Sequence, residues 1–93
     1  MISEIRILGH VVQIETFGRD GTAHKGECEY DRNEIRIGDW LHDSMAEATL
    51  LHEIVHFIDD CLDLNLSEEQ VAGVAQGLYQ VLCDNPEFLR RKK

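Results

Sequence analysis

Hydrophobic and polar positions alternate with a period of two in the first part of the chain. From Ile5 to Phe17, β-branched residues recur in rough alternation, which predicts one strand, or two short strands bent at Gly9. Residues 18–26 are rich in glycine and polar side chains and are typical of a loop. The alternation returns over 27–37, where the polar segment 31–33 suits the turn of a tight hairpin.

A helical spacing follows Gly38-Asp39. Asp43 or Ser44 can cap the start of a first helix, and Glu47 stands three residues after Ser44, which completes a capping-box pattern. The helix is predicted to end near Leu62. Apolar side chains occupy most of its circumference, which indicates a helix buried centrally in the molecule.

A second helix is predicted after Ser67, a good N-cap with Gln70 at the capping-box position. Asn85-Pro86 ends it. Its apolar stripe consists of Val71, Val74, Ala75, Leu78, Val81 and Leu82. Because only a few residues separate the two helices, we expect them to pack as an antiparallel pair.

Together these patterns predict an α+β fold, in which a small antiparallel sheet, made of one or two strands and a β-hairpin, is followed by two packed helices. Ninety-three residues leave room for a single core, so we expect one domain over 1–93. Within it, the β half covers 1–38, the two-helix half covers 43–83 and a C-terminal tail covers 84–93.

Charge and composition exclude several classes of function. The net charge is −9, and because the last four residues, Arg90 to Lys93, are all basic, the rest of the chain carries −13. Such a surface repels phosphate backbones, so nucleic-acid binding is not expected, and we interpret the basic end as a solvated tail. No apolar stretch reaches the length of a membrane span, and the N-terminus lacks the layout of a signal peptide. We therefore expect a cytoplasmic protein that does not bind membranes.

The three cysteines, Cys28, Cys61 and Cys83, are widely spaced and form no CxxC pair, which favours reduced thiols over a disulfide framework. Cys61 follows His52 by nine residues, so it can approach any site built on that helix. A small apolar role in the core is the stronger expectation for it.

The candidate chemistry lies in the first helix. His52-Glu53-Ile54-Val55-His56 is an HExxH pattern, and histidines at i and i+4 project from one face of an α-helix. Two imidazole nitrogens at that spacing can bind one Zn²⁺, and Glu53 can activate water beside the metal. The simpler alternative is a pair of partly exposed surface histidines.

A catalytic zinc ion usually takes three protein ligands, so a third should come from an element packed against this helix. Glu68 and Glu69 open the second helix, and Glu68 shares a face with Val71 and Ala75. This direction favours Glu68 and leaves Glu69 as the alternative. Acidic residues are also common in the first turn of any helix.

Further residues are candidates for supporting roles. Asp59 follows His56 by three residues and can hold a ligand histidine through the free ring N–H, or be solvated. His42 and Tyr30 are possible oxyanion donors, although a surface histidine and a packed tyrosine are the simpler interpretations. Trp40 is expected in the core.

These motifs resemble those of the small phage- and prophage-encoded HExxH proteins, which are similar to zincin metallopeptidases and distantly related in plan to the ImmA/IrrE type. The resemblance spans about Gly26 to Pro86. Its most specific parts are the HExxH run Leu50–Asp59 and the opening of the second helix, Leu66–Val71. The fold that the resemblance implies is a minimal zincin-like core, with an antiparallel sheet behind an active-site helix and an acidic ligand from a second helix.

The resemblance also implies roles. His52 and His56 would be zinc ligands, Glu53 the general base, and Glu68 or Glu69 the third ligand. The predicted function is therefore zinc-dependent hydrolysis of peptide bonds in a peptide or protein substrate. The alternative is a non-catalytic metal-binding interaction or regulatory protein of phage or prophage origin.

Overall fold

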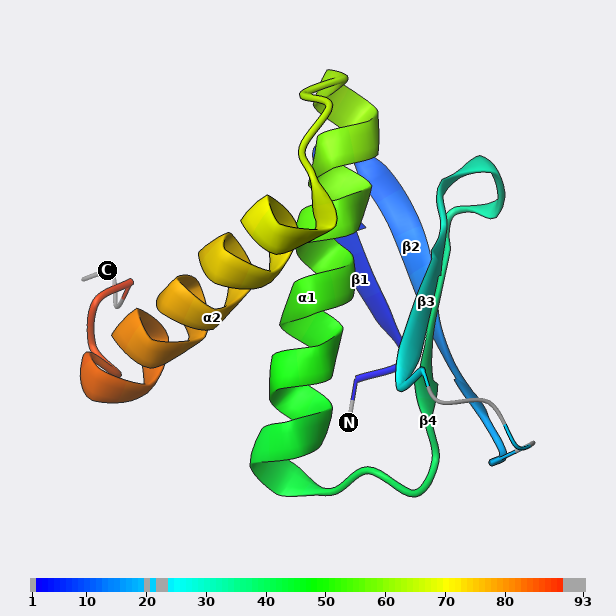
Figure 1. Ribbon diagram of the computed structural model, residues 1–93, viewed down its shortest axis with the longest axis horizontal. Helices are drawn as coiled ribbons and strands as arrows, with labels where there is room; N and C mark the ends of the chain where they lie inside the picture. The colour runs from blue at the N-terminus through cyan, green and yellow to red at the C-terminus, as the bar shows by residue number, and fades with distance from the viewer. Residues whose placement is uncertain (1, 20, 22–23, 90–93) are drawn as a thin grey trace.

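The computed structural model describes residues 2–19, 21 and 24–89, and the remainder of the predicted loop and tail (20, 22, 23 and 90–93) lies outside these residues. The described chain is an α+β fold, with a four-stranded sheet followed by two packed helices (Figure 1). The strands are β1 (Glu4–Ile7), β2 (His10–Phe17), β3 (Gly26–Glu29) and β4 (Glu34–Gly38). The short 3-10 helix η1 (Tyr30–Arg32) precedes β4, and the helices are α1 (Asp43–Leu62) and α2 (Glu68–Asp84).

The predicted bend at Gly9 is a tight turn that separates β1 from β2. Ile7 pairs with His10 across the turn, and both intervening residues have positive φ, 49° at Leu8 and 88° at Gly9. Positive φ at both central positions is the type I′ geometry, which matches the twist of a two-residue hairpin. The first apolar stretch therefore forms two strands.

The sheet is mixed, so the prediction of an antiparallel sheet is wrong in one pairing. The strand order is β1-β2-β4-β3, and β2 pairs with β4 in parallel, from Gln13 with Glu34 to Phe17 with Gly38. The predicted hairpin of β3 and β4 is confirmed as antiparallel. In this hairpin, β4 is the strand next to β2, and β3 forms the edge of the sheet. Alternation within a strand does not encode the direction of its neighbour, which is why the sequence pattern missed this pairing.

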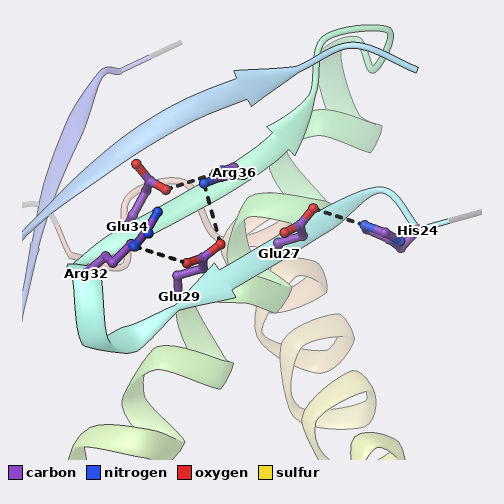
Figure 2. A network of polar contacts seen from close by, with 6 residues as sticks. All are labelled: His24, Glu27, Glu29, Arg32, Glu34 and Arg36. Carbon is purple, nitrogen blue, oxygen red and sulfur yellow. Dashed lines mark hydrogen bonds and ion pairs between the residues drawn. The ribbon is translucent and has the colours of Figure 1, made fainter. Parts of the chain in front are cut away.

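A network of polar contacts connects β3 to β4 on the face of the sheet away from α1 (Figure 2). Arg36 Nε donates to Glu34 Oε1 at 2.9 Å, and Arg36 Nη2 lies 3.5 Å from Glu29 Oε1. The neighbouring pairs are His24 with Glu27 and Arg32 with Glu29. Exposed pairs of this kind contribute about 0–1 kcal/mol each, so they support the edge strand without dominating its stability.

The main core lies between α1 and the other face of the sheet. Its buried side chains are Ile7, Val12, Ile14, Ile35, Ile37, Leu41, Ala46 and Phe57. A smaller cluster of Val55, Val71 and Ala75, with Leu66 packed beside it, joins α2 to α1. The helix that carries the HExxH motif is therefore central, as its pattern predicted (Figure 1).

The buried residues through which α2 packs on α1 lie in the first half of α2. Val71 and Ala75 are buried, but Val74, Leu78, Val81 and Leu82 are 40–47% exposed. Figure 1 shows α2 diverging from α1 toward its C-terminal end. Four of the six residues of the apolar stripe predicted on α2 are therefore exposed among the described residues.

The two helix starts differ from each other. Ser67 accepts a hydrogen bond from Gln70 N while the Gln70 side chain accepts one from Ser67 N, so the predicted capping box of α2 is confirmed. The capping box predicted from Ser44 is wrong, because α1 begins at Asp43 with His42 as its N-cap and without a side-chain cap. Among the described residues, no helix is long and apolar enough to cross a membrane.

Candidate metal centre

Three side chains from the two helices converge on one point. Nε2 of His52 lies 2.8 Å from Oε1 of Glu68, and Nε2 of His56 lies 3.0 Å from Oε2 of the same carboxylate. The two imidazole rings stand 5.0 Å apart between centroids, as expected for residues one helical turn apart. One carboxylate therefore bridges both histidines of the HExxH motif.

The turn between α1 and α2 places Glu68 beside the two histidines. Asp63 ends α1 with φ 52°, and its backbone N–H donates to the Asp59 carbonyl. Asp59 Oδ1 then accepts a hydrogen bond from the backbone N–H of Leu66 at 3.1 Å. The capping box at Ser67 starts α2 directly afterwards, so Glu68 is the first residue of the helix and lies beside α1.

Asp59 thus contacts the connecting turn in this structure. Its expected hydrogen bond to a ring N–H of a ligand histidine remains a prediction. The Asp59 carboxylate binds the backbone of Leu66, two residues before Glu68. Asp59 therefore helps to position Glu68, and this hydrogen bond does not involve His52 or His56.

The donor set suits a divalent metal ion. One ligand atom from each of His52, His56 and Glu68 can be chosen so that all lie within 4.8 Å of one another. Ligands bonded to zinc at about 2.1 Å in a tetrahedron lie about 3.4 Å apart, so a small movement of these atoms accommodates an ion. The hydrogen bond between His52 and Glu68 needs a proton on Nε2 of His52 if the carboxylate accepts it, and a metal ion bound to that nitrogen would replace the proton. Glu69 is exposed and does not belong to this group.

Glu53 lies beside this cluster and is 6% exposed, the only charged residue in the buried set of the described chain. Burial raises the pKa of its carboxyl group, and the neighbouring His56 and His52 partly oppose that rise. A buried carboxyl group that faces two imidazoles is suited to accepting and returning a proton.

The backbone of β3 approaches Glu53 closely at Gly26. A Cβ atom at Gly26 would lie 2.9 Å from both Glu53 Oε2 and Thr49 Cγ2. Gly26 belongs to the predicted loop 18–26, and the sequence pattern assigns no role to it. A glycine at the start of an alternating stretch is the signal that could have identified it, because such glycines mark places where two backbones or a ligand approach.

These residues line one cleft of about 1020 Å³ between β3, α1 and α2. Its walls include Gly26, Cys28, Asp60 and Tyr79 in addition to the histidines and glutamates already described. Burial, followed by the charge of Glu53, raises the pKa of the Cys28 thiol to about 12, so this cysteine is a poor nucleophile at neutral pH.

The remaining candidates lie elsewhere. Cys61 packs against the main core, and Tyr30 packs edge-on against Phe57 with ring centroids 5.0 Å apart. Trp40 is partly buried at the edge of the core, 5.4 Å from Phe17. His42 is exposed at the start of α1 and does not line the cleft.

Comparison with known proteins yields no relative. No family model, no curated protein and no solved structure matches this chain.

Proposed function

We propose that this protein is a zinc-dependent metallopeptidase-like hydrolase of minimal zincin plan, as the resemblance of its motifs implies. The observation that carries the proposal is the convergence of His52, His56 and Glu68 beside the buried carboxyl group of Glu53. Two histidines and one carboxylate are a ligand set of catalytic zinc sites, which keep one position open for water or substrate.

The chemistry follows from the parts. His52, His56 and Glu68 would hold a zinc ion, which when bound would supply Lewis-acid chemistry by polarising a carbonyl oxygen and lowering the pKa of water. Glu53 is not one of the three ligands, so its carboxyl group is available for proton transfer. Its carboxylate accepts a proton from the attacking water and returns the proton to the leaving amine.

The edge strand β3 supports a peptide as substrate. One side of β3 pairs with β4, and the other side has no partner strand among the described residues. An extended peptide can add to such an edge through backbone hydrogen bonds. Because Gly26 brings this edge against Glu53, a peptide docked there passes close to the proposed general base.

Zinc analysis and peptide cleavage together test the proposal. Protein purified without chelator should carry near-equimolar zinc and cleave members of a random peptide library, monitored by mass spectrometry. Glu53→Gln should retain the zinc and lose cleavage by at least about a hundredfold, because the base is not a ligand. His52→Ala and Glu68→Ala should lose both, while Glu69→Ala should lose neither.

Two outcomes would contradict the assignment. Zinc retained in Glu68→Ala and lost in Glu69→Ala would move the third ligand by one residue. Cleavage that survives Glu53→Gln unchanged would show that the peptidase activity arises elsewhere, for example from a contaminant.

A second candidate function is a non-catalytic metal-binding interaction protein. The exposed apolar residues of α2 favour it, because contiguous apolar surface on a small domain marks contact sites. Zinc bound at one equivalent, with no cleavage by parent or Glu53→Gln protein, would support this function over hydrolysis.

A further inference from the structure

A second concave surface lies between α1 and the diverging half of α2. It is a groove of about 740 Å³ whose apolar lining includes Leu41, Ala46, Leu50, Leu51, Ile54 and Leu82. Tyr79, whose hydroxyl donates to Glu47 Oε1 at 2.9 Å, borders both this groove and the metal-site cleft. The groove is distinct from the metal centre, because none of His52, His56 and Glu68 lines it.

Exposed apolar side chains lie along α2 both in the groove, at Leu82, and outside its lining, at Leu78 and Val81. Leu78 and Val81 are each 45% exposed and Leu82 is 40% exposed. Single exposed apolar side chains are ordinary, but several on one helix beside an apolar groove mark an interaction surface.

The groove is lined by two acidic residues, Asp43 and Glu47, and by no lysine or arginine among the described residues. The two helices that form it also contain no lysine or arginine. The helices of a second copy would therefore bring acidic residues against acidic residues, whereas a cationic partner helix would be attracted.

We infer that the groove binds an amphipathic helix of a partner protein, with an apolar face flanked by lysine or arginine. Such a helix places side chains at i, i+3, i+4 and i+7 into an apolar groove, and its cations face the acidic rim. The inference does not depend on the proposed hydrolysis, since it uses no residue of the metal cluster.

A synthetic leucine–lysine helix about four turns long is the probe, labelled with fluorescein and titrated with the full chain by anisotropy. We expect saturable binding at one site. Leu82→Asn should weaken it roughly tenfold, because an apolar contact in the groove is lost. Asp43→Asn should weaken it about twofold at low salt and less at high salt. Val11→Asn, which removes an exposed valine from β2 on the sheet, is the matched control and should leave affinity unchanged.

A peptide of the same composition in scrambled order separates groove binding from simple charge attraction. Equal binding of the ordered and scrambled peptides, or equal binding to the Leu82→Asn protein, would overturn the inference. So would a leucine–glutamate helix that binds as well as the leucine–lysine one. Sedimentation showing a dimer of the parent that Leu82→Asn dissociates would identify a second copy as the occupant and would also overturn it.

Discussion

The contact between Gly26 and Glu53 places the strongest local constraint on the proposed centre. The Glu53 side chain is enclosed by α1 and by the β3 backbone, and a hydrogen atom at Gly26 leaves just enough space for it. Any larger side chain must displace the carboxylate or the edge strand. The proposed general base and the proposed peptide-docking edge would therefore depend on the same glycine.

Gly26→Ala should destabilise the protein by about 1–3 kcal/mol, because its Cβ would lie 2.9 Å from Glu53 Oε2 and from Thr49 Cγ2. It should also lower the proposed cleavage while zinc content is preserved. Gly73→Ala is the matched control. No atom would lie within 4 Å of a Cβ at Gly73, which is a helical residue of α2, so this change should stabilise the protein by up to about 1 kcal/mol. Urea unfolding measures the stability change of each variant. If both variants were stabilised, or both destabilised, the steric conflict inferred at Gly26 would be contradicted.

Cys28 should be protected from alkylation. A thiol with a pKa of about 12 is ionised to about one part in ten thousand at pH 8, and the thiolate is the reactive species. Iodoacetamide should therefore modify the exposed Cys83 first, and its rate at Cys28 should rise about tenfold per pH unit while the fold persists. Peptide mapping by mass spectrometry gives both rates. In urea the difference should vanish, and a fast reaction at Cys28 in the folded state would show that the thiol is less buried than described.

Sequence spacing was sufficient to predict that His52 and His56 share a face, because helical periodicity fixes that relation locally. Glu68 was favoured over Glu69 by its place on the buried stripe of α2, and the structure brings Glu68 to the histidines. Gly26 could not be found in this way. Its role depends on a contact between a strand and a helix that are far apart in sequence. A glycine at the start of an alternating stretch can indicate a close approach, but it does not identify the residue approached.

The start of α2 is the element on which the proposed third ligand depends. Ser67→Ala removes the hydroxyl that accepts the Gln70 N–H, and should cost about 1 kcal/mol of stability. Because Glu68 is the next residue, zinc affinity should fall as well. Ser44→Ala is the control at the start of α1, where no side-chain cap exists, and should change stability by less than about 0.5 kcal/mol. Equal losses in the two variants, measured by thermal unfolding, would contradict the capping argument.

Most elements could be predicted from the chain, but their arrangement could not. Alternation and helical periodicity located the hairpin and the two helices, since these signals are local. The parallel pairing of β2 with β4 joins strands separated by the loop and β3, so it depends on which strand edge is free. Likewise, the apolar stripe on α2 predicted that Leu78 and Leu82 are buried. Both side chains are exposed, because α2 diverges from α1 toward its C-terminal end.

At the scale of the whole molecule, the fold consists of one large cluster and one small cluster. The sheet and α1 share the main core, whereas α2 is joined to α1 by Val55, Val71 and Ala75 with Leu66 beside them. A ligand that binds only the folded state stabilises it by mass action, by about 2.7 kcal/mol at a hundred times the dissociation constant. Zinc held between α1 and α2 would therefore stabilise the junction that is formed by the smaller of the two buried clusters.

Zinc should raise the thermal midpoint by roughly 10–20 °C at that concentration, since 1 kcal/mol corresponds to about 4–8 °C in a domain of this size. A chelator should reverse the change, and His52→Ala should abolish it.

Hydrogen exchange resolved by segment tests where the zinc ion binds. Zinc should slow exchange near Glu68 and Val71, where α2 meets α1, and leave the exposed stretch around Val81 nearly unchanged. Cys83→Ser controls for adventitious thiol binding, because Cys83 is exposed. Loss of the zinc effect in Cys83→Ser, with the effect kept in His52→Ala, would place the metal away from the two histidines.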